Sequence, residues 1–263
     1  DLATAAMLDL AHERRHSSNW RPQLLCLPSW PMNTGSKGTS TGKSDAGAGG
    51  WDEAGGADAA GDMLLGVASQ LKKGRGLCVV AEVVEGDLAR ERGLSTRVGA
   101  TRHALEARLE DANVRGFAHV VVAPSYRAGK SFAIQALGFG GLEPNTVLLG
   151  WPRRNAMDFD EDEAEEVDEE DEEAQEAKDE AARVLVETVC ECTASEKAVL
   201  LCLGLEAFPS SEARVEGFVD VWWVVHDGGL LLMIAHLLLR HKTWAGCKLR
   251  VHTVLQSAQD PAA

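Results

Sequence analysis

Apolar runs alternate with amphipathic stretches along most of this chain, and the alternation predicts strands and helices in regular succession. The predicted strands are Gln23–Leu27, Leu77–Val84, Phe117–Ala123, Thr146–Leu149 and Ala198–Leu203. The helices expected between them are a segment capped by Asp62 and ending at Lys73, Val98–Asp111, about Ala128–Leu137, and about Ala174–Cys190. For Val98–Asp111, the inward face is expected to hold Ala100, Ala104, Leu105 and Leu109. This succession is typical of a three-layer α/β fold, in which right-handed crossovers join the strands of a mostly parallel sheet.

The stretch Gly217–Gln256 predicts one further strand–helix–strand unit. Val and Trp favour a strand over Phe218–Val225, and a second strand is expected over Lys248–Leu255. Leu230–Leu239 is apolar nearly all round, which predicts a buried helix. Because both strands are continuously apolar, we expect a parallel pair whose two faces are covered. Residues Asp227–Gly229 are predicted to form a turn in which Asp227 caps the helix.

Two long segments interrupt this pattern. Residues 33–61 consist mostly of Gly, Ser, Thr, Ala and Asp, so they are expected to form a flexible loop. Residues 158–180 hold 16 acidic residues and one lysine, which accounts for the whole net charge of −15. The remaining 25 acidic and 25 basic residues balance (41 − 16 and 26 − 1), which argues against a basic nucleic-acid-binding protein.

The six cysteines show no spacing typical of a disulfide framework, which favours a reducing, cytosolic setting. Cys190 and Cys192 do not form a CxxC pair and have no second pair to complete a metal site, so we expect no metal. There is no apolar run of about 18 residues, so no membrane span is predicted. The chain has no signal peptide, begins without Met and ends after a predicted strand, so we expect it to be a fragment.

Three short motifs suggest chemistry, and each has a structural alternative. Thr41–Ser44 resembles the end of a phosphate-binding P-loop, but Lys37 stands where that loop needs its first glycine, and no strand and helix flank it. His226 and Asp227 could act as an acid/base pair, yet no nucleophile is placed nearby, and capping by Asp227 is the preferred interpretation. Gly138–Gly141 indicates either a ligand approached closely by the backbone or a helix C-cap and turn. We predict no catalytic residue.

Several motifs, taken in order, resemble the cytosolic C-terminal domain of cation–chloride cotransporters. The resemblance is closest to the potassium–chloride branch, which shares the Trp-Trp pair and the His-Asp-Gly-Gly sequence. It covers the chain from about Asn19 to Gln256. The motifs that carry it are Asn19–Leu25, Val114–Phe117, Leu137–Gly141, Asn145–Val147, Gly150–Pro152, Val219–Gly229 and Cys247–Val251.

The resemblance implies a particular domain organisation. Residues 1–18 would be a helix that links the domain to a membrane domain. Residues 19–208 would be a first α/β half resembling the universal stress proteins, with disordered inserts at about 31–61 and 153–173. Residues 209–263 would begin a second, similar half that is truncated.

The resemblance also implies a function. The chain would be a non-enzymatic regulatory and dimerisation domain, cytoplasmic in location, of a multi-pass, electroneutral, chloride-coupled potassium symporter. Its partners would be its own membrane transport domain, a second copy of itself and regulatory kinases, with no nucleic acid. No cofactor is required, but some family members bind ATP, which implies a site at Leu27, Pro28, Gly138, Gly140 and Gly141. The family has lysines after the first strand, whereas Pro28-Ser29-Trp30 stand here. The alternatives are a nucleotide-binding sensor of the stress-protein type and a nucleotide-hydrolysing enzyme.

Overall fold

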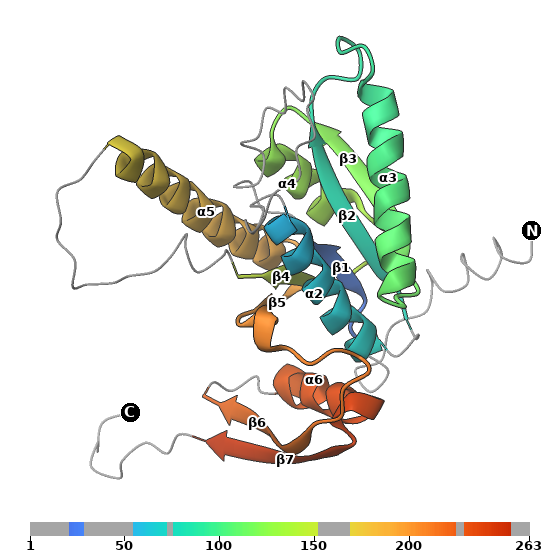
Figure 1. Ribbon diagram of the computed structural model, residues 1–263, viewed down its shortest axis with the longest axis vertical. Helices are drawn as coiled ribbons and strands as arrows, with labels where there is room; N and C mark the ends of the chain where they lie inside the picture. The colour runs from blue at the N-terminus through green and yellow to red at the C-terminus, as the bar shows by residue number, and fades with distance from the viewer. Residues whose placement is uncertain (1–20, 29–54, 73–75, 152–168, 225–228, 254–263) are drawn as a thin grey trace, which may run out of the picture.

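The computed structural model describes residues 21–28, 55–72, 76–151, 169–224 and 229–253 (Figure 1). Strands and helices alternate through the first half of the chain, as the sequence predicts. In chain order these elements are β1 (Leu24–Leu27), α2 (Gly55–Lys72), β2 (Cys78–Glu85), α3 (Leu94–Asp111), β3 (Phe117–Ala123), α4 (Tyr126–Ala136), β4 (Thr146–Gly150), α5 (Glu169–Ala194) and β5 (Ala198–Cys202).

The five strands form one parallel sheet in the order β3-β2-β1-β4-β5. β1 lies in the middle, where Leu24 is in register with Cys78 of β2 and with Thr146 of β4. The chain winds outward from β1 in one direction through β2 and β3, and then returns to β4 on the other side of β1. The strand order therefore reverses between β1 and β4, which is the usual position for ligands in doubly wound sheets.

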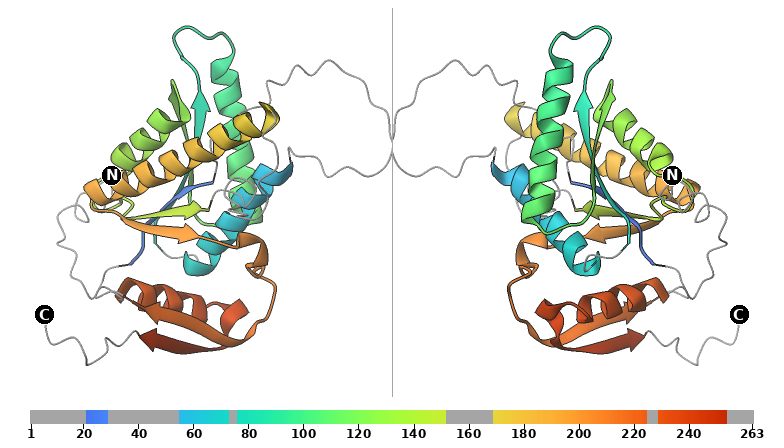
Figure 2. Two further views of the ribbon diagram at one scale, coloured as in Figure 1. Left: turned by 90° about the vertical axis from the view of Figure 1, so that its left-hand side faces the viewer. Right: turned by 90° about the vertical axis from the view of Figure 1, so that its right-hand side faces the viewer.

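Helices cover both faces of this sheet (Figure 2). Successive side chains of a strand point to opposite faces, so Leu24 and Cys26 join the buried cluster formed with α2 and α3. Leu25 and Leu27 join the cluster formed with α4 and α5 on the other face. The predicted three-layer α/β fold with a mostly parallel sheet is thus confirmed.

The second half contains the predicted strand–helix–strand unit. After a short 3₁₀ helix, η4 (Leu205–Ala207), it consists of β6 (Glu216–Trp223), α6 (Gly229–Leu239), the 3₁₀ helix η5 (Lys242–Trp244) and β7 (Gly246–Thr253). β6 and β7 pair in parallel as a separate two-stranded sheet. This confirms the predicted connection of two parallel strands through a helix.

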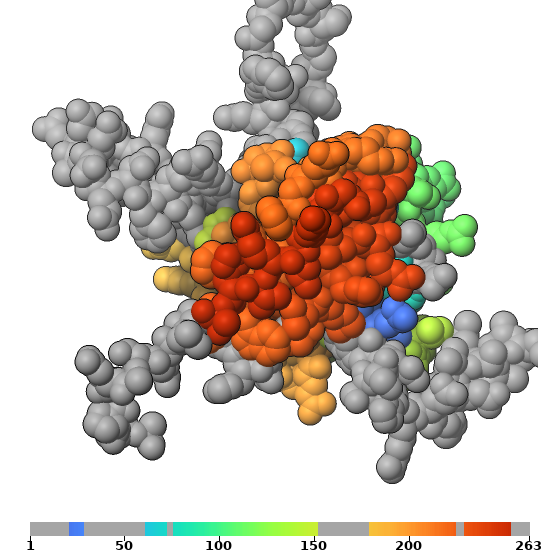
Figure 3. All heavy atoms as spheres, turned by 90° about the horizontal axis from the view of Figure 1, so that it is seen from below, coloured from blue at the N-terminus to red at the C-terminus, as the bar shows by residue number. Residues whose placement is uncertain are grey.

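The prediction that this second sheet is covered on both faces is wrong for the described residues. α6 packs on one face, and the opposite face is exposed (Figures 1 and 3). The all-apolar helix is also not fully buried, since Ala235 is its only buried residue. A continuous apolar sequence indicates how much apolar surface an element can bury. How much of it is buried depends on the elements that pack against it.

Several element boundaries differ from the prediction. α2 begins at Gly55, so residues 55–61 of the predicted loop are helical, and Asp62 lies inside the helix instead of capping it. The Gly- and Ala-rich start has no apolar period, and the helix depends on the later residues that pack on the sheet. α3 begins at Leu94, and its Ala100 and Ala104 are exposed, whereas Leu105 and Leu109 are buried as expected.

α5 begins at Glu169, so residues 169–173 of the predicted disordered insert are helical, and the rest of that insert lies outside the described residues. Glutamate is a good helix former, which is consistent with a helical start in this acidic sequence. β6 and β7 each begin two residues before the predicted start, at Glu216 and Gly246. The linking helix implied at residues 1–18, the Thr41–Ser44 motif, His226 and the Asp227 cap lie outside the described residues.

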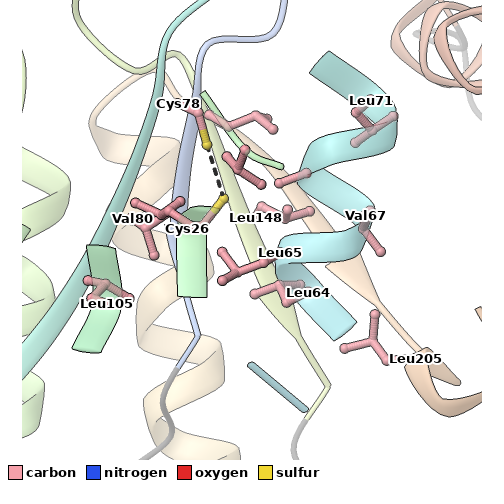
Figure 4. Close-up of a cluster of buried hydrophobic side chains, with 14 residues drawn as sticks. Cys26, Leu64, Leu65, Val67, Leu71, Cys78, Val80, Leu105, Leu148 and Leu205 are labelled. Carbon is pink, nitrogen blue, oxygen red and sulfur yellow. Dashed lines mark hydrogen bonds between the residues drawn. The ribbon is translucent and has the colours of Figure 1, made fainter. Parts of the chain in front are cut away.

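Two cysteines, Cys26 and Cys78, face the inner side of α2 (Figure 4), and Lys72 lies at the end of that helix. The Sγ atoms of Cys26 and Cys78 lie 3.8 Å apart in the buried cluster, and the hydrogen bond between them, together with burial, raises the pKa of Cys26. Lys72, in the last turn of α2, donates a hydrogen bond to the carbonyl oxygen of Pro22 at 2.7 Å. Burial lowers the pKa of Lys72 to about 8. These contacts fasten the end of α2 to the segment that enters β1.

Candidate functional site

The residues implied for ATP binding fall into two groups that the structure does not bring together. Leu27 ends β1, and Pro28 follows it at the carboxyl end of the sheet. Gly138–Gly141 lies after α4, at the opposite end of β1, where the side chain of Gln23 donates a hydrogen bond to the carbonyl oxygen of Gly141 at 3.4 Å. The two groups therefore lie at opposite ends of β1.

The turn geometry accounts for the glycines in the second group. Gly138 has φ 117° and Gly140 has φ 51°, values that side chains with a Cβ rarely adopt. A Cβ added at Gly138 would also lie 2.6 Å from the Cα of Glu143. Leu142 closes the turn by donating its backbone N–H to the carbonyl oxygen of Phe139 at 2.9 Å. The glycines are needed for the chain to turn from α4 into β4.

A cationic side chain lies beside the first group, and sequence reasoning missed it. Gly61 in α2 leaves space that the Arg108 guanidinium fills, and a Cβ at Gly61 would also lie 3.2 Å from the Cβ of Pro28. Arg108 donates from Nε to Oδ1 of Asp62 at 2.6 Å. The guanidinium thus stands next to the carboxyl end of β1. Because α2 and α3 carry these residues, no local sequence pattern could show that they meet.

A polar clamp joins the two halves of the molecule. Trp244 of η5 donates from its indole nitrogen to Oε1 of Gln70 at 2.6 Å, and Nε2 of Gln70 donates to the carbonyl oxygen of Pro209 at 2.7 Å. The Phe208 ring lies against Trp244, with centroids 5.7 Å apart. Apolar residues of α6 extend this contact by packing against the cluster that contains α2: Ile234, Leu237 and Leu238. Gln70 is fully buried, so α2 lies in the core of both halves.

The exposed face of the β6–β7 sheet, hereafter the open face, lies on the side of the molecule seen in Figure 3, and three of its rows of paired residues carry aromatic or charged side chains. Alternation along the strands places every second residue on this face, and the parallel register pairs them across the strands. The rows are Phe218 with Lys248, Asp220 with Arg250, and Trp222 with His252. Phe218 is 55% exposed and Trp222 is 63% exposed.

Contacts between these side chains fix the open face before anything binds it. Arg250 donates from Nε and Nη2 to the two carboxylate oxygens of Asp220 at 2.6 and 2.8 Å, and His252 Nε2 lies 3.1 Å from Asp220 Oδ1. The guanidinium of Arg250 also lies 4.4 Å from the centre of the Phe218 ring. The Trp222 and His252 rings stack, with centroids 4.3 Å apart. The hydrogen bonds from Arg250 lower the pKa of Asp220 to about 2.

The open face has the composition of a protein–protein interface. Trp, Phe and Arg are enriched where proteins bind one another, and large exposed aromatic side chains mark such places. Trp222 and Trp223 are consecutive in the sequence. The structure separates them, because Trp223 shares the α6 side with the buried Val221, whereas Trp222 stands on the open face.

The sequence matches the model of one protein family, solute carrier family 12, over residues 62–164 and 153–262. The chain belongs to this family, the cation–chloride cotransporters. The match confirms the family to which the sequence motifs pointed. The transporters of solute carrier family 12 are membrane proteins, but none of the helices among the described residues is long and apolar enough to cross a membrane. Nor do the described residues bring three or more His, Cys, Asp or Glu together as a metal site.

Proposed function

We propose that this chain is the cytosolic regulatory and dimerisation domain of a potassium–chloride cotransporter and has no enzymatic activity of its own. The observation that carries the proposal is the open face, a preorganised aromatic and charged surface on a chain of the cation–chloride cotransporter family. The sequence support for the potassium–chloride branch is the Trp222-Trp223 pair and the His-Asp-Gly-Gly sequence that begins at His226.

The proposed mechanism couples assembly to transport. A second copy binds the domain, and residues 1–18 connect the domain to the membrane transport domain. The Gln70–Trp244 clamp transmits a change in one half to the other, because it fixes β6–α6–β7 on α2. Regulatory kinases are the further partners, and each half is proposed to resemble a universal stress protein.

Two measurements test this function. Light scattering of the purified chain at rising micromolar concentration is expected to approach about twice the monomer mass of 28.2 kDa. In cells that express the transporter carrying this domain, rubidium uptake is expected to require chloride and not sodium. Uptake that requires sodium would contradict the potassium–chloride assignment, and a monomer at every concentration would contradict the dimerisation role.

A nucleotide-binding sensor is the second candidate function, and the Arg108 guanidinium beside Pro28 favours it. Doubly wound sheets bind ligands beyond the carboxyl ends of their strands where the order reverses, which here means β1 and β4. Leu27 and Pro28 lie at that end, and a guanidinium can form paired, charge-assisted hydrogen bonds with phosphate. ATP is therefore proposed to bind near Leu27, Pro28 and Arg108, away from Gly138–Gly141.

An ATP titration followed by calorimetry and backbone NMR tests this second candidate. We expect the amide signals of residues around Leu27 to shift while those of Gly138–Gly141 stay in place. Arg108→Met should weaken binding about tenfold, the effect of losing one charge-assisted contact. Arg127→Met removes an ion-paired arginine from the other face of the sheet and serves as the matched control. Absence of heat and of shifts at millimolar ATP would exclude the sensor, and release of inorganic phosphate would contradict the non-enzymatic assignment.

A further inference from the structure

We propose that Ser95, in the first turn of α3, is phosphorylated by a protein kinase that recognises arginine before its substrate serine. This inference rests on the proposed regulation by kinases and names the residue on which they act. The sequence from Arg90 to Ser95 is Arg-Glu-Arg-Gly-Leu-Ser, so arginines stand three and five residues before the serine. Basophilic kinases recognise such a pattern through acidic groups in their peptide groove, because charge patterns select the substrate.

The loop between β2 and α3 presents this pattern to solvent. Residues 87–93 are all exposed, and so is Ser95. The loop projects at one end of the molecule, whereas β6, α6 and β7 lie at the other end (Figure 1). Its exposure therefore does not depend on the elements that pack on the β6–β7 sheet. A kinase can reach the hydroxyl group of Ser95 without separating one described element from another.

The two arginines before Ser95 are available to a kinase. Arg92 forms no ion pair and no side-chain hydrogen bond with any residue in the part of the chain that the structure describes. Nε of Arg90 lies 3.4 Å from Oδ2 of Asp87, and the two side chains are 87% and 48% exposed. Exposed ion pairs contribute little to stability, so a kinase can replace this pair at small cost.

The first turn of α3 is weakly held, which suits a substrate that becomes extended in the groove of a kinase. Gly93 occupies the N-cap position with φ 88°, and it has no side chain to cap the helix. The first turn also contains no acidic residue to interact with the helix dipole. Leu94 is the one buried residue of this turn, and Leu105 and Leu109 hold the rest of the helix. Unwinding the first turn therefore breaks few contacts.

The phosphoryl transfer needs ATP as its co-reactant, and the kinase supplies the base. The Oγ atom of Ser95 forms a bond to the γ-phosphorus, the bond from that phosphorus to the ADP oxygen breaks, and ADP leaves with the electron pair. The kinase base takes the hydroxyl proton. Residues 86–97 hold three arginines and two acidic residues, a net charge of +1. A phosphate adds about −1.5 to −2 charges, so the sign of the charge in this segment reverses.

A phosphate on Ser95 supplies what the start of α3 lacks. Negative charge in the first turn of a helix is stabilised by the helix dipole and by the backbone N–H groups that point out of the helix. The guanidinium of Arg92, in the adjoining turn, can form paired, charge-assisted hydrogen bonds with phosphate. Phosphorylation is therefore expected to stabilise the first turn of α3 and to fix the loop before it.

An assay with purified components tests the site. The chain is incubated with ATP and the catalytic domain of a kinase that selects arginine three and five residues before serine, and peptide mass spectrometry locates the phosphate. Ser95 is expected to be the main site. Arg92→Gln should slow its phosphorylation at least about tenfold, the effect of losing one charge-assisted contact. Arg97→Gln removes an exposed arginine that follows the serine, so it is the matched control and should change the rate little.

Ser17 provides an internal comparison, because Arg14 and Arg15 also precede it closely. Phosphorylation of Ser17 without Ser95 would overturn the proposed site, although regulation by kinases would stand. Equal rates for Arg92→Gln and the wild type would also overturn it, because the arginine pattern would then play no part. If no residue of the chain is phosphorylated, both the site and regulation by kinases of this class are contradicted.

Hydrogen exchange measures the structural consequence. In the phosphorylated chain, amides of residues 94–98 are expected to exchange about fivefold more slowly, the effect of one favourable charge at a helix N-terminus. Peptides from β7 should not change. Ser95→Asp needs no kinase and should slow the same amides to a smaller extent, whereas Ser95→Ala should not slow them. If the phosphorylated chain and Ser95→Asp both exchange like the wild type, the phosphate does not stabilise the start of α3, and this inference is wrong.

Discussion

Replacing Lys130 with alanine is expected to lower the free energy of unfolding by about 3–5 kcal/mol, the cost typical of removing one partner from a buried ion pair. Lys130 lies on α4 with only 1% of its surface exposed, and its Nζ donates to Thr188 Oγ1 at 2.7 Å and to the carbonyl oxygen of Val184 at 3.3 Å. Glu191 Oε2 lies 3.6 Å away. Burial lowers the pKa of Lys130, and the carboxylates of Glu191 and Glu187 oppose that shift.

The expected loss comes mainly from the carboxylates that would remain. Oε2 of Glu191 is buried and accepts no hydrogen bond, so the ammonium group of Lys130 supplies its nearby positive charge, whereas Glu187 also pairs with Arg127 through Oε1. Removing the ammonium group leaves negative charge in a site that water reaches poorly. The contact joins α4 to α5, so its loss should loosen the outer layer of the sheet.

Urea denaturation followed by circular dichroism measures this effect. Lys130→Met keeps most of the aliphatic chain and isolates the contribution of the charge, while Arg127→Met removes an exposed partner of Glu187 and should change the stability by less than about 1 kcal/mol. Lys130→Met combined with Glu191→Gln should recover part of the loss, since the unpaired charge is then also removed. Equal stability of Lys130→Met and the wild type would show that the ion pair contributes nothing.

Much of the fold could be predicted because local pattern and tertiary environment agree. The predicted strand Phe117–Ala123 matches β3 at both ends, where Gly116 and Pro124 flank the apolar run. The start of α2 could not be predicted in this way. Its first residues have no apolar period, and the helix is held by Leu64, Leu65 and Leu71, which lie later in the same helix.

The order of elements in the sequence already indicates where the two groups of the implied ATP site lie. Gly138–Gly141 follows a helix and precedes a strand, and in a parallel sheet every such connection lies at the amino ends of the strands. Leu27 and Pro28 follow a strand and therefore lie at the carboxyl ends. The alternation of elements already predicted that the two groups lie apart, whereas Arg108 beside Pro28 depends on a contact between two helices.

The open face could not be predicted because its rows depend on register. Trp222 and His252 stack only because β6 and β7 pair in parallel with these two residues opposite each other. The sequence indicates a strand–helix–strand unit, but a shift of one residue in either strand would turn its side chains to the other face. The apolar runs also predicted a sheet covered on both sides, so an exposed face with an ion pair at its centre was not expected.

Replacing Trp244 with alanine is expected to separate the unfolding of β6–α6–β7 from that of the five-stranded sheet. Loss of a packed Trp typically costs about 3–5 kcal/mol, and the half-buried Trp244 should lie near the lower end. It would also leave the buried Oε1 of Gln70 without its 2.6 Å partner, which adds about 1–3 kcal/mol of destabilisation. Most of this stabilisation acts between the two halves of the molecule, because Phe208 and the clamp residues lie at their junction.

Hydrogen exchange measured by mass spectrometry distinguishes this local effect from global destabilisation. In Trp244→Ala, peptides from β6 and β7 should lose protection by a factor of about 100 or more, as expected for about 3 kcal/mol, whereas peptides from β1 and β4 should change little. Gln70→Leu preserves most of the side-chain volume but leaves the Trp244 indole N–H and the Pro209 carbonyl oxygen without this partner, so it should show the same regional pattern. Trp222→Ala, an exposed tryptophan of the same unit, should leave exchange at the junction unchanged. If β1 and β6 lose protection equally in Trp244→Ala, the two halves unfold as one cooperative unit. The clamp then does not form a separate connection between the open face and the first sheet.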